Sequence, residues 1–193
     1  MEGLIYGHRT RIGYTCSPVI AEVFPYEFYK VVPEGVTLAI PTLTVLKAIG
    51  DELQTSYDIS LRTSREMGAA GVDLMVLWGA PDLSSEYLGR AECEVIASAP
   101  MPSAPPLNYL GRLSSEASFE VACELVRAHL EADTRYFPCA HRATIDKLES
   151  MEEELGVGVL SASSAIIWEA LRRCGIREPI QGFGRLFRDP GDG

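Results

Sequence analysis

The chain has 193 residues, which is enough for one substantial hydrophobic core or for two small lobes that share a cleft. Hydrophobic residues make up 47% of it and charged residues 23%, an ordinary globular composition that excludes a disordered chain. The net charge of -10 argues against binding to nucleic acid or to anionic membranes, although a few backbone N–H groups could still bind a small anionic substrate.

The sequence also limits where the protein works and which groups it binds. No apolar run is long enough to span a bilayer, and the first 10 residues lack the apolar core of a signal peptide, so we expect a cytoplasmic protein. Its 5 cysteines form no CxxC pair and its 3 histidines are dispersed, which favours reduced thiols and argues against a metal site. No GxGxxG, P-loop or GxSxG motif is present, and we expect no cofactor.

The first part of the chain alternates between predicted strands and helices. Residues 11–16 (RIGYTC) predict a buried strand that ends at Cys16. Residues 19–32 predict a helix that begins near Pro25, and residues 36–40 predict a second strand. This order is typical of parallel α/β folds.

A long helix and an apolar strand follow. Leucine and isoleucine recur at helical spacing from residue 43 to residue 61, which predicts a crossover helix, with room for an interruption near Tyr57, that ends at residues 68–71. Residues 72–78 (VDLMVLW) are almost all apolar, as in a central parallel strand that helices cover on both faces. This strand opens directly into Gly79.

The middle of the chain predicts a division into two lobes. Residues 93–98 predict a short strand, and the proline-rich residues 99–110 cannot pair regularly, so they suit a connection between lobes or an active-site lid. We predict an N-terminal lobe over residues 1–98, a connection over 99–111 and a C-terminal lobe over 112–193, with a cleft between the lobes.

The rest of the chain alternates in the same way. The predicted elements are a helix at 114–130, a strand at 135–138 that ends at Cys139, a helix at 144–155 closed by Gly156, a strand at 157–160 and a helix at 165–174. The serines before the last helix are predicted to cap it. The run of glutamates at positions 149 and 152–154 predicts a solvated helix face. We therefore predict an α/β fold with open, mainly parallel sheets.

Candidate binding residues lie where the predicted strands end. Ligands of open parallel sheets bind beyond the carboxyl ends of the strands, where helix N-termini direct their N–H groups outward. The segments with that predicted position are Cys16-Ser17-Pro18, Gly79-Ala80-Pro81, Cys139-Ala140-His141 and Ser161-Ala162-Ser163-Ser164.

Two of the cysteines are candidates for a reactive thiol. Cys139 is predicted to lie between a strand and a helix N-terminus, where the helix dipole favours a thiolate, although burial as a small hydrophobic residue explains its position equally well. Cys16 has a similar but less favourable position, because no helix clearly begins after it. The other cysteines, Cys93, Cys123 and Cys174, are predicted to be packing residues.

His141 lies two positions after Cys139 and has two interpretations. It could stabilise a thiolate or act as a second acid or base if both side chains faced the cleft. The favoured interpretation is an exposed polar residue in the first turn of a helix.

Four segments of the last third carry a resemblance to known enzymes. They are residues 137–146 (FPCAHRATID), 155–164 (LGVGVLSASS), 167–175 (IWEALRRCG) and 182–187 (GFGRLF), and weaker matches occur at 11–18, 33–36 and 72–89. In this order the segments resemble the arylmalonate decarboxylase and maleate isomerase group of the Asp/Glu racemase superfamily.

The resemblance implies a fold and an activity. The fold would have two similar α/β lobes, here with a reduced second lobe, and an active site between them. Racemases and maleate isomerases carry a cysteine in both lobes, whereas this chain resembles arylmalonate decarboxylase, with Gly79 at the first position and Cys139 at the second. The implied chemistry occurs at the carbon alpha to a carboxylate or carbonyl. Cys139 would donate or remove the proton of an enediolate held by backbone N–H groups near Gly79, Ala140 and Ser163.

Three alternatives to a decarboxylase stay open. An isomerase or cyclase would use the same cysteine on an activated carbonyl substrate, and a two-base racemase would pair Cys16 with Cys139. A non-catalytic relative would bind a carboxylate or a partner protein. The expected ligand of an enzyme is a small carboxylate or carbonyl compound, and the sequence is compatible with a homo-oligomer.

Overall fold

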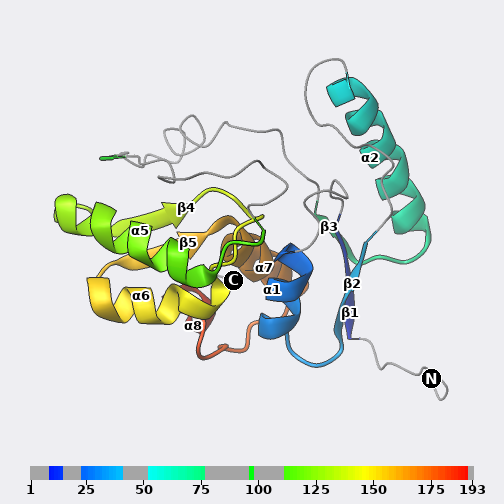
Figure 1. Ribbon diagram of the computed structural model, residues 1–193. Coiled ribbons are helices and arrows are strands. Elements are labelled where there is room, and N and C mark those ends of the chain that lie inside the picture. The colour runs from blue at the N-terminus through cyan, green and yellow to red at the C-terminus, as the bar shows by residue number, and fades with distance from the viewer. Residues whose placement is uncertain (1–8, 15–22, 41–51, 77–95, 98–110, 191–193) are drawn as a thin grey trace.

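The computed structural model describes residues 9–14, 23–40, 52–76, 96–97 and 111–190. The N-terminal elements are β1 (Thr10–Tyr14), α1 (Val23–Val31), β2 (Val36–Ala39), α2 (Glu52–Ala69) and β3 (Leu74–Val76). The C-terminal elements are α5 (Ser115–Ala128), β4 (Thr134–Phe137), η2 (Ile145–Lys147), α6 (Leu148–Leu155), β5 (Gly158–Ser161), α7 (Ala162–Arg173) and α8 (Arg185–Arg188). The two groups of elements lie next to one another (Figure 1).

Each group contains a small parallel sheet. The N-terminal sheet has the order β2-β1-β3, with Thr10 opposite Val36 and Ile12 opposite Leu74. In the C-terminal sheet β4 pairs with β5 in parallel. The predicted α/β fold with mainly parallel sheets is therefore confirmed.

The strand order of the first sheet is known for its described strands. Among these, β1 lies between β2 and β3, and β3 comes from the apolar run at 72–78. Ile12 of β1 is fully buried, whereas the residues of β3 are only partly buried. An apolar run shows that a strand avoids water, but strand order depends on pairing with distant segments.

Several predicted elements differ from the structure at their ends. Helix α1 begins at Val23, so Pro25 lies in its first turn, where a missing N–H group costs no hydrogen bond. Helix α2 continues through Tyr57 without the interruption considered above. Only Ile96 and Ala97 of the predicted strand at 93–98 are described, and neither lies in a strand.

One hydrophobic core joins the two groups of elements. It contains Ile12 of β1, Phe24 and Phe28 of α1, Phe137 of β4 and Leu171 of α7, all almost fully buried. Helix α7 contacts α1, β3, β5 and α8, and it lies at the centre of the molecule (Figure 1). The carboxyl ends of β4 and β5 are therefore held close to the N-terminal elements.

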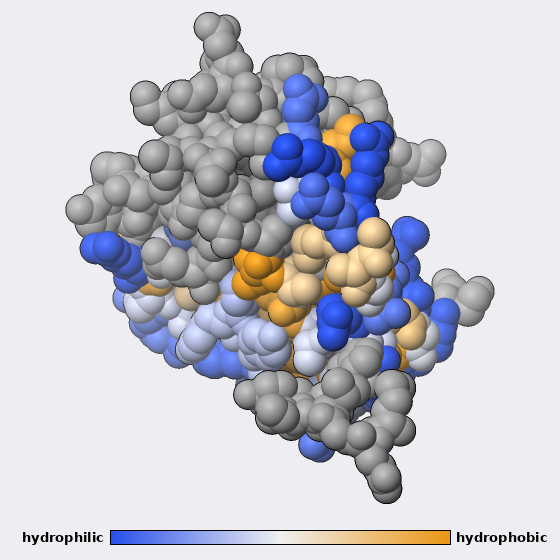
Figure 2. Space-filling model, turned by 90° about the vertical axis from the view of Figure 1, so that its right-hand side faces the viewer, coloured by the Kyte–Doolittle hydropathy of each residue, from blue (hydrophilic) through white to orange (hydrophobic). Residues whose placement is uncertain are grey.

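Exposed apolar side chains are more frequent on the N-terminal elements. Figure 2 shows hydrophobic residues gathered at the surface between hydrophilic ones on the face that lies to the right in Figure 1. The large exposed hydrophobic residues of the described ranges are Tyr26, Tyr29, Ile40, Leu61, Ile96 and Leu130. Within the described ranges, no helix combines the length and the apolar character that crossing a membrane requires.

Candidate active site at the carboxyl ends of β4 and β5

Cys139 lies two residues after the end of a parallel strand. Strand β4 ends at Phe137, whose register partner is Ser161 at the end of β5. Cys139 is partly buried, and the chain turns at Ala140 and His141 immediately after it. We call residues 139–142 the Cys139 turn. It therefore lies at the edge of the sheet where ligands of parallel α/β proteins bind.

The N-terminus of α7 lies against this turn. The hydroxyl of Ser161 accepts a hydrogen bond from the N–H group of Ser164 at 3.1 Å, and the hydroxyl of Ser164 accepts one from the N–H group of Ser161 at 2.9 Å. This reciprocal capping box starts the helix at Ala162. The Ser163 hydroxyl donates to the Ala140 carbonyl at 3.3 Å, which joins the first turn of α7 to the Cys139 turn.

Two predictions about helix starts are corrected by this arrangement. The last helix begins three residues before the predicted Ala165, because Ser161 rather than a later serine is the cap. The helix after Cys139 was predicted from residue 144, but a 3-10 turn comes first and α6 starts only at Leu148. The helix dipole that acts near the turn is therefore that of α7, the helix after the neighbouring strand.

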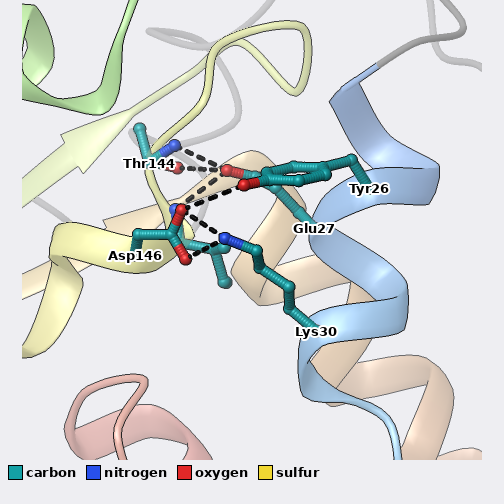
Figure 3. Close-up of polar contacts among 6 residues, drawn as sticks. Tyr26, Glu27, Lys30, Thr144 and Asp146 are labelled. Carbon is teal, nitrogen blue, oxygen red and sulfur yellow. Dashed lines mark hydrogen bonds and ion pairs between the residues drawn. The ribbon is translucent and has the colours of Figure 1, made fainter.

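A buried carboxylate from the N-terminal group binds the segment between the turn and α6 (Figure 3). Glu27 of α1 has 0% of its surface exposed. Its Oε1 atom accepts hydrogen bonds from the N–H groups of Thr144 at 2.5 Å and Ile145 at 2.8 Å, and from the Thr144 hydroxyl at 3.3 Å. On the exposed side of this contact Lys30 binds both carboxylate oxygens of Asp146 at 2.5 Å. Helix α1 thus holds this segment at two points.

The environment of Glu27 favours its protonated form. Burial raises the pKa of its carboxyl above the ordinary value. The nearby Ser163 hydroxyl and the hydrogen bonds from Thr144 and Ile145 lower the pKa, but by less than burial raises it. Glu27 is therefore a titratable group that links α1, the start of α7 and the segment after the Cys139 turn.

His141 is buried, so the interpretation as an exposed residue in a helical turn was wrong. Only 4% of its surface is exposed, and it lies in a turn before the 3-10 segment. A Cβ atom added to Gly111 would come within 2.7 Å of the His141 ring and 3.0 Å of the Val23 side chain. The imidazole therefore packs over a glycine, next to the start of α1.

Arg142 closes the Cys139 turn and is held by α5. Its Nε atom donates to the hydroxyl of Ser118 at 2.8 Å, and this hydroxyl in turn donates to the Ala143 carbonyl at 3.3 Å. Burial lowers the pKa of Arg142, and the negative charge of the Cys139 thiolate opposes that effect. Burial, and after it the Cys139 charge, raise the pKa of Tyr136. Arg142 and Tyr136 are thus the described charged and phenolic groups that interact electrostatically with Cys139.

Solved structures share this arrangement of elements. The chain matches a crystal structure of arylmalonate decarboxylase with a TM-score of 0.67 at 17% identity, over 92% of this chain and 98% of that one. The fold is that of arylmalonate decarboxylase. It also matches maleate cis-trans isomerase of Nocardia farcinica bound to Tris, with a TM-score of 0.64 at 14% identity, over 93% and 98% of the two chains. No protein-family model matches, and no curated protein matches by sequence.

A second structure of the isomerase bears on the role of its cysteine. It is a cysteine-to-serine variant with a covalently bound succinylcysteine intermediate, and it matches with a TM-score of 0.62 at 14% identity. The predicted resemblance to the arylmalonate decarboxylase and maleate isomerase group is confirmed for the fold.

The arylmalonate decarboxylase fold brings together only part of the predicted site. Ala140, Ser161, Ser163 and Ser164 lie around the Cys139 turn. The segments Cys16-Ser17-Pro18 and Gly79-Ala80-Pro81 lie outside the described residues. Among the described residues, no group of three or more histidine, cysteine or acidic side chains is placed to hold a metal ion.

The remaining cysteines and glutamates give one confirmation and one correction. Cys123 is buried on α5, and Cys174 packs partly buried against the core, as predicted for packing residues.

Glu152 was predicted on a solvated face, but it is only 4% exposed and accepts hydrogen bonds from the N–H groups of Val159 at 3.1 Å and Arg185 at 2.7 Å. A run of charged residues in a sequence does not reveal that one of them points inward and accepts hydrogen bonds from buried backbone N–H groups.

Two residues of the site were missed by sequence reasoning. Glu27 is the only acidic residue in the α1 sequence VFPYEFYKV, where it interrupts an apolar face, and that interruption was the available signal. Arg142 lies inside a recognised segment, but its role depends on contacts with α5 that no local pattern encodes.

Proposed function

We propose that the protein is a cofactor-independent lyase or isomerase that acts at the carbon alpha to a carboxylate or carbonyl group. Cys139 is its proton donor or acceptor, as in an arylmalonate decarboxylase. The observation that carries this proposal is the partly buried Cys139 at the end of β4, with the N-terminus of α7 bound to the next residue through Ser163 and Ala140. The fold shared with arylmalonate decarboxylase and maleate isomerase supports an enzyme of this kind.

The proposed reaction uses proton chemistry alone. A substrate with two carboxylates on one carbon loses CO2, and the electron pair of the broken bond becomes an enediolate on the carboxylate that remains. Backbone N–H groups of Ala140 and Ser163, at the positive end of α7, stabilise the developing oxyanion. The Cys139 thiol then donates its proton to carbon, and the resulting thiolate takes a proton from solvent. With an isomerisable substrate the same thiolate removes a proton instead.

The position of the site follows from the proposed lobes. Residues 1–98 and 112–193 form the two lobes, and the cleft between them receives a small carboxylate or carbonyl substrate. Gly79, Ala80 and Pro81 contribute the opposite wall, together with Cys16, Ser17 and Pro18. We expect this enzyme to work in the cytoplasm without a metal or organic cofactor.

The test measures CO2 release and exchange of hydrogen with solvent deuterium on a panel of carboxylates. Aryl- and alkyl-substituted malonates are assayed for stoichiometric CO2 release, and monocarboxylates with an alpha hydrogen are assayed for exchange with solvent deuterium. We expect Cys139→Ser and Cys139→Ala to lose at least about 1,000-fold in kcat, because the group that transfers the proton is gone. Cys174→Ser, which removes another partly buried thiol, serves as the matched control and should keep wild-type activity.

The outcomes separate the alternatives. Turnover without CO2 release indicates an isomerase or cyclase. Deuterium in both enantiomers together with inactivity of Cys16→Ala indicates a two-base racemase. Full activity of Cys139→Ala on a true substrate would contradict the proposal, and so would an unreactive Cys139 in a protein that only binds carboxylates.

A further inference from the structure

Glu27 is a buried acid that pairs with no lysine or arginine of the described ranges. Its carboxyl is fully buried on α1, and its Oε1 atom accepts the N–H groups of Thr144 and Ile145 (Figure 3). Its Oε2 atom is also buried and has no hydrogen-bond partner among the described residues. An unpaired charge is expensive to bury, so a carboxyl in this place is most stable when it is neutral.

The Ser163 hydroxyl connects this acid to the residue that follows Cys139. It lies near the Glu27 carboxyl, and it donates its proton to the Ala140 carbonyl at 3.3 Å. Ser163 is fully buried, so its hydroxyl cannot turn to bulk water instead. A hydroxyl has one proton to donate and can accept a hydrogen bond at the same time. A protonated Glu27 therefore leaves the Ser163 proton to Ala140, whereas an ionised Glu27 competes for it.

We propose that Glu27 is a positioning residue for Cys139, and that the proton on its buried carboxyl decides whether the Cys139 turn stays bound to α7. With this proton present, Oε2 of Glu27 donates to the Ser163 hydroxyl, which in turn donates to the Ala140 carbonyl. Without it, the Ser163 proton turns to the carboxylate and the Ala140 carbonyl loses its donor. The inference rests on the proposed function for the role of Cys139, but the coupling to Glu27 does not require turnover.

Several other ionisable groups lie on the elements packed around Glu27. On α1 itself, Lys30 and Tyr26 both contact Asp146 on the exposed side. Helix α7 has no charged residue before Glu169. Burial raises the pKa of Glu27, and no charged side chain of the described residues contributes to the shift. The other groups that titrate or carry charge are Tyr14 of β1, which stacks on α1, Cys139, His141 and Arg142 of the turn, and Lys147 of η2.

Hydrogen exchange of the turn tests the coupling without a substrate. Protection of the amides of residues 139–145 is measured by mass spectrometry from about pH 4 to about pH 8 and corrected for the intrinsic exchange rate. The pKa of Glu27 is raised in the closed form, so protection should be greatest below the open-state value of about 4.3. It should fall by up to about tenfold per pH unit as the pH rises to the folded value, and then level off.

Variants assign this fall to the Glu27 proton and leave the other ionisable groups in place. Glu27→Gln keeps a neutral side chain of the same shape, with an amide N–H group for Ser163, so its protection should be high and independent of pH. Ser163→Ala should lower the protection at acid pH by about fivefold, the loss of one hydrogen bond.

Glu152→Gln is the matched control. Glu152 is a second buried glutamate that accepts two backbone N–H groups, but on α6 and with arginines nearby. This variant should keep the wild-type pH dependence of exchange in the Cys139 turn. A Glu152→Gln curve as flat as that of Glu27→Gln would contradict the inference.

Iodoacetamide connects the result to Cys139. At a pH that ionises the thiol fully, the turn is released in wild type but not in Glu27→Gln, so Cys139 should react at least about threefold more slowly in the variant. Wild-type protection that does not change with pH, parallel curves for wild type and Glu27→Gln, or equal Cys139 rates would each overturn the inference. The expected curves in a protein without turnover would contradict the proposed function and leave the coupling of Glu27 to the turn in place.

Discussion

Glu27 and Glu152 are two buried glutamates that both accept hydrogen bonds from backbone N–H groups, but in different surroundings. Glu27 of α1 accepts N–H groups of Thr144 and Ile145 and so connects the two groups of elements. Glu152 of α6 accepts N–H groups of Val159 and Arg185 and connects elements within the C-terminal group. Both satisfy backbone donors that would otherwise be buried without acceptors.

The difference between the two lies in their counter-ions. Arg188 and Arg185 approach the Glu152 carboxylate to 3.9 Å and 4.0 Å. No lysine or arginine of the described ranges pairs with Glu27, and burial raises the pKa of this residue. A carboxylate buried without a cation is a poor site for a charge, and it is found here next to the proposed active site. The comparison therefore separates a purely structural carboxylate from one that can sense pH near Cys139.

The largest change in stability is expected from removing the Glu27 or the Glu152 carboxylate. Glu27→Ala and Glu152→Ala should each lower the free energy of unfolding by about 3 kcal/mol, because two buried N–H groups lose their acceptor in each case. Urea unfolding measures this loss. Only Glu27→Ala should also raise the rate at which iodoacetamide modifies Cys139, by at least about threefold, because it releases the segment after the Cys139 turn. An equal increase of the Cys139 modification rate in Glu152→Ala would show that the effect is not specific to Glu27.

The second largest effect is expected on the pH dependence of stability, which should differ between the Glu27 and Glu152 variants. Because its pKa is raised in the folded state, Glu27 stabilises the fold most below the unfolded value of about 4.3, and this contribution is lost as the pH rises through the folded value. Glu27→Gln keeps a neutral side chain at every pH, so its stability relative to wild type should increase steadily from acid to neutral pH.

Glu152→Gln is the matched control for this measurement. Its N–H donors lose a charged acceptor, so it should be less stable than wild type at neutral pH by about 1–2 kcal/mol. Urea unfolding at a series of pH values distinguishes the two variants. Parallel pH curves for wild type and Glu27→Gln would show that Glu27 does not titrate over this range.

The smallest effect is expected on the exposed side of the α1 contact. Asp146→Asn removes the ion pair between Asp146 and Lys30, and both of these side chains are partly exposed. The substitution should lower the free energy of unfolding by about 0.5 kcal/mol. The difference from wild type should disappear at high salt, because exposed charges are screened. Thermal unfolding at low and high salt measures both quantities. A loss as large as that of Glu27→Ala would mean that the contact depends on charge rather than on buried hydrogen bonds.

The sequence by itself determined the fold type and the position of Cys139 at a strand end. Both depend on local information: the alternation of apolar strands with helices, the glycine that ends α6, and short segments whose order resembles one group of enzymes. These signals act over a few residues, so one sequence is enough to find them. Strand ends were predicted to within one or two residues in β1, β2, β4 and β5.

Tertiary structure decided which groups surround the cysteine. The carboxylate of Glu27 comes from α1, the positive helix end from α7 and the hydroxyl that holds Arg142 from α5. Likewise, among the described strands of the first sheet, β1 pairs with both β2 and β3. Each of these contacts joins residues far apart in the chain, and their energies depend on burial and direction, which a local pattern does not contain. A buried charge looks the same in a sequence as an exposed one.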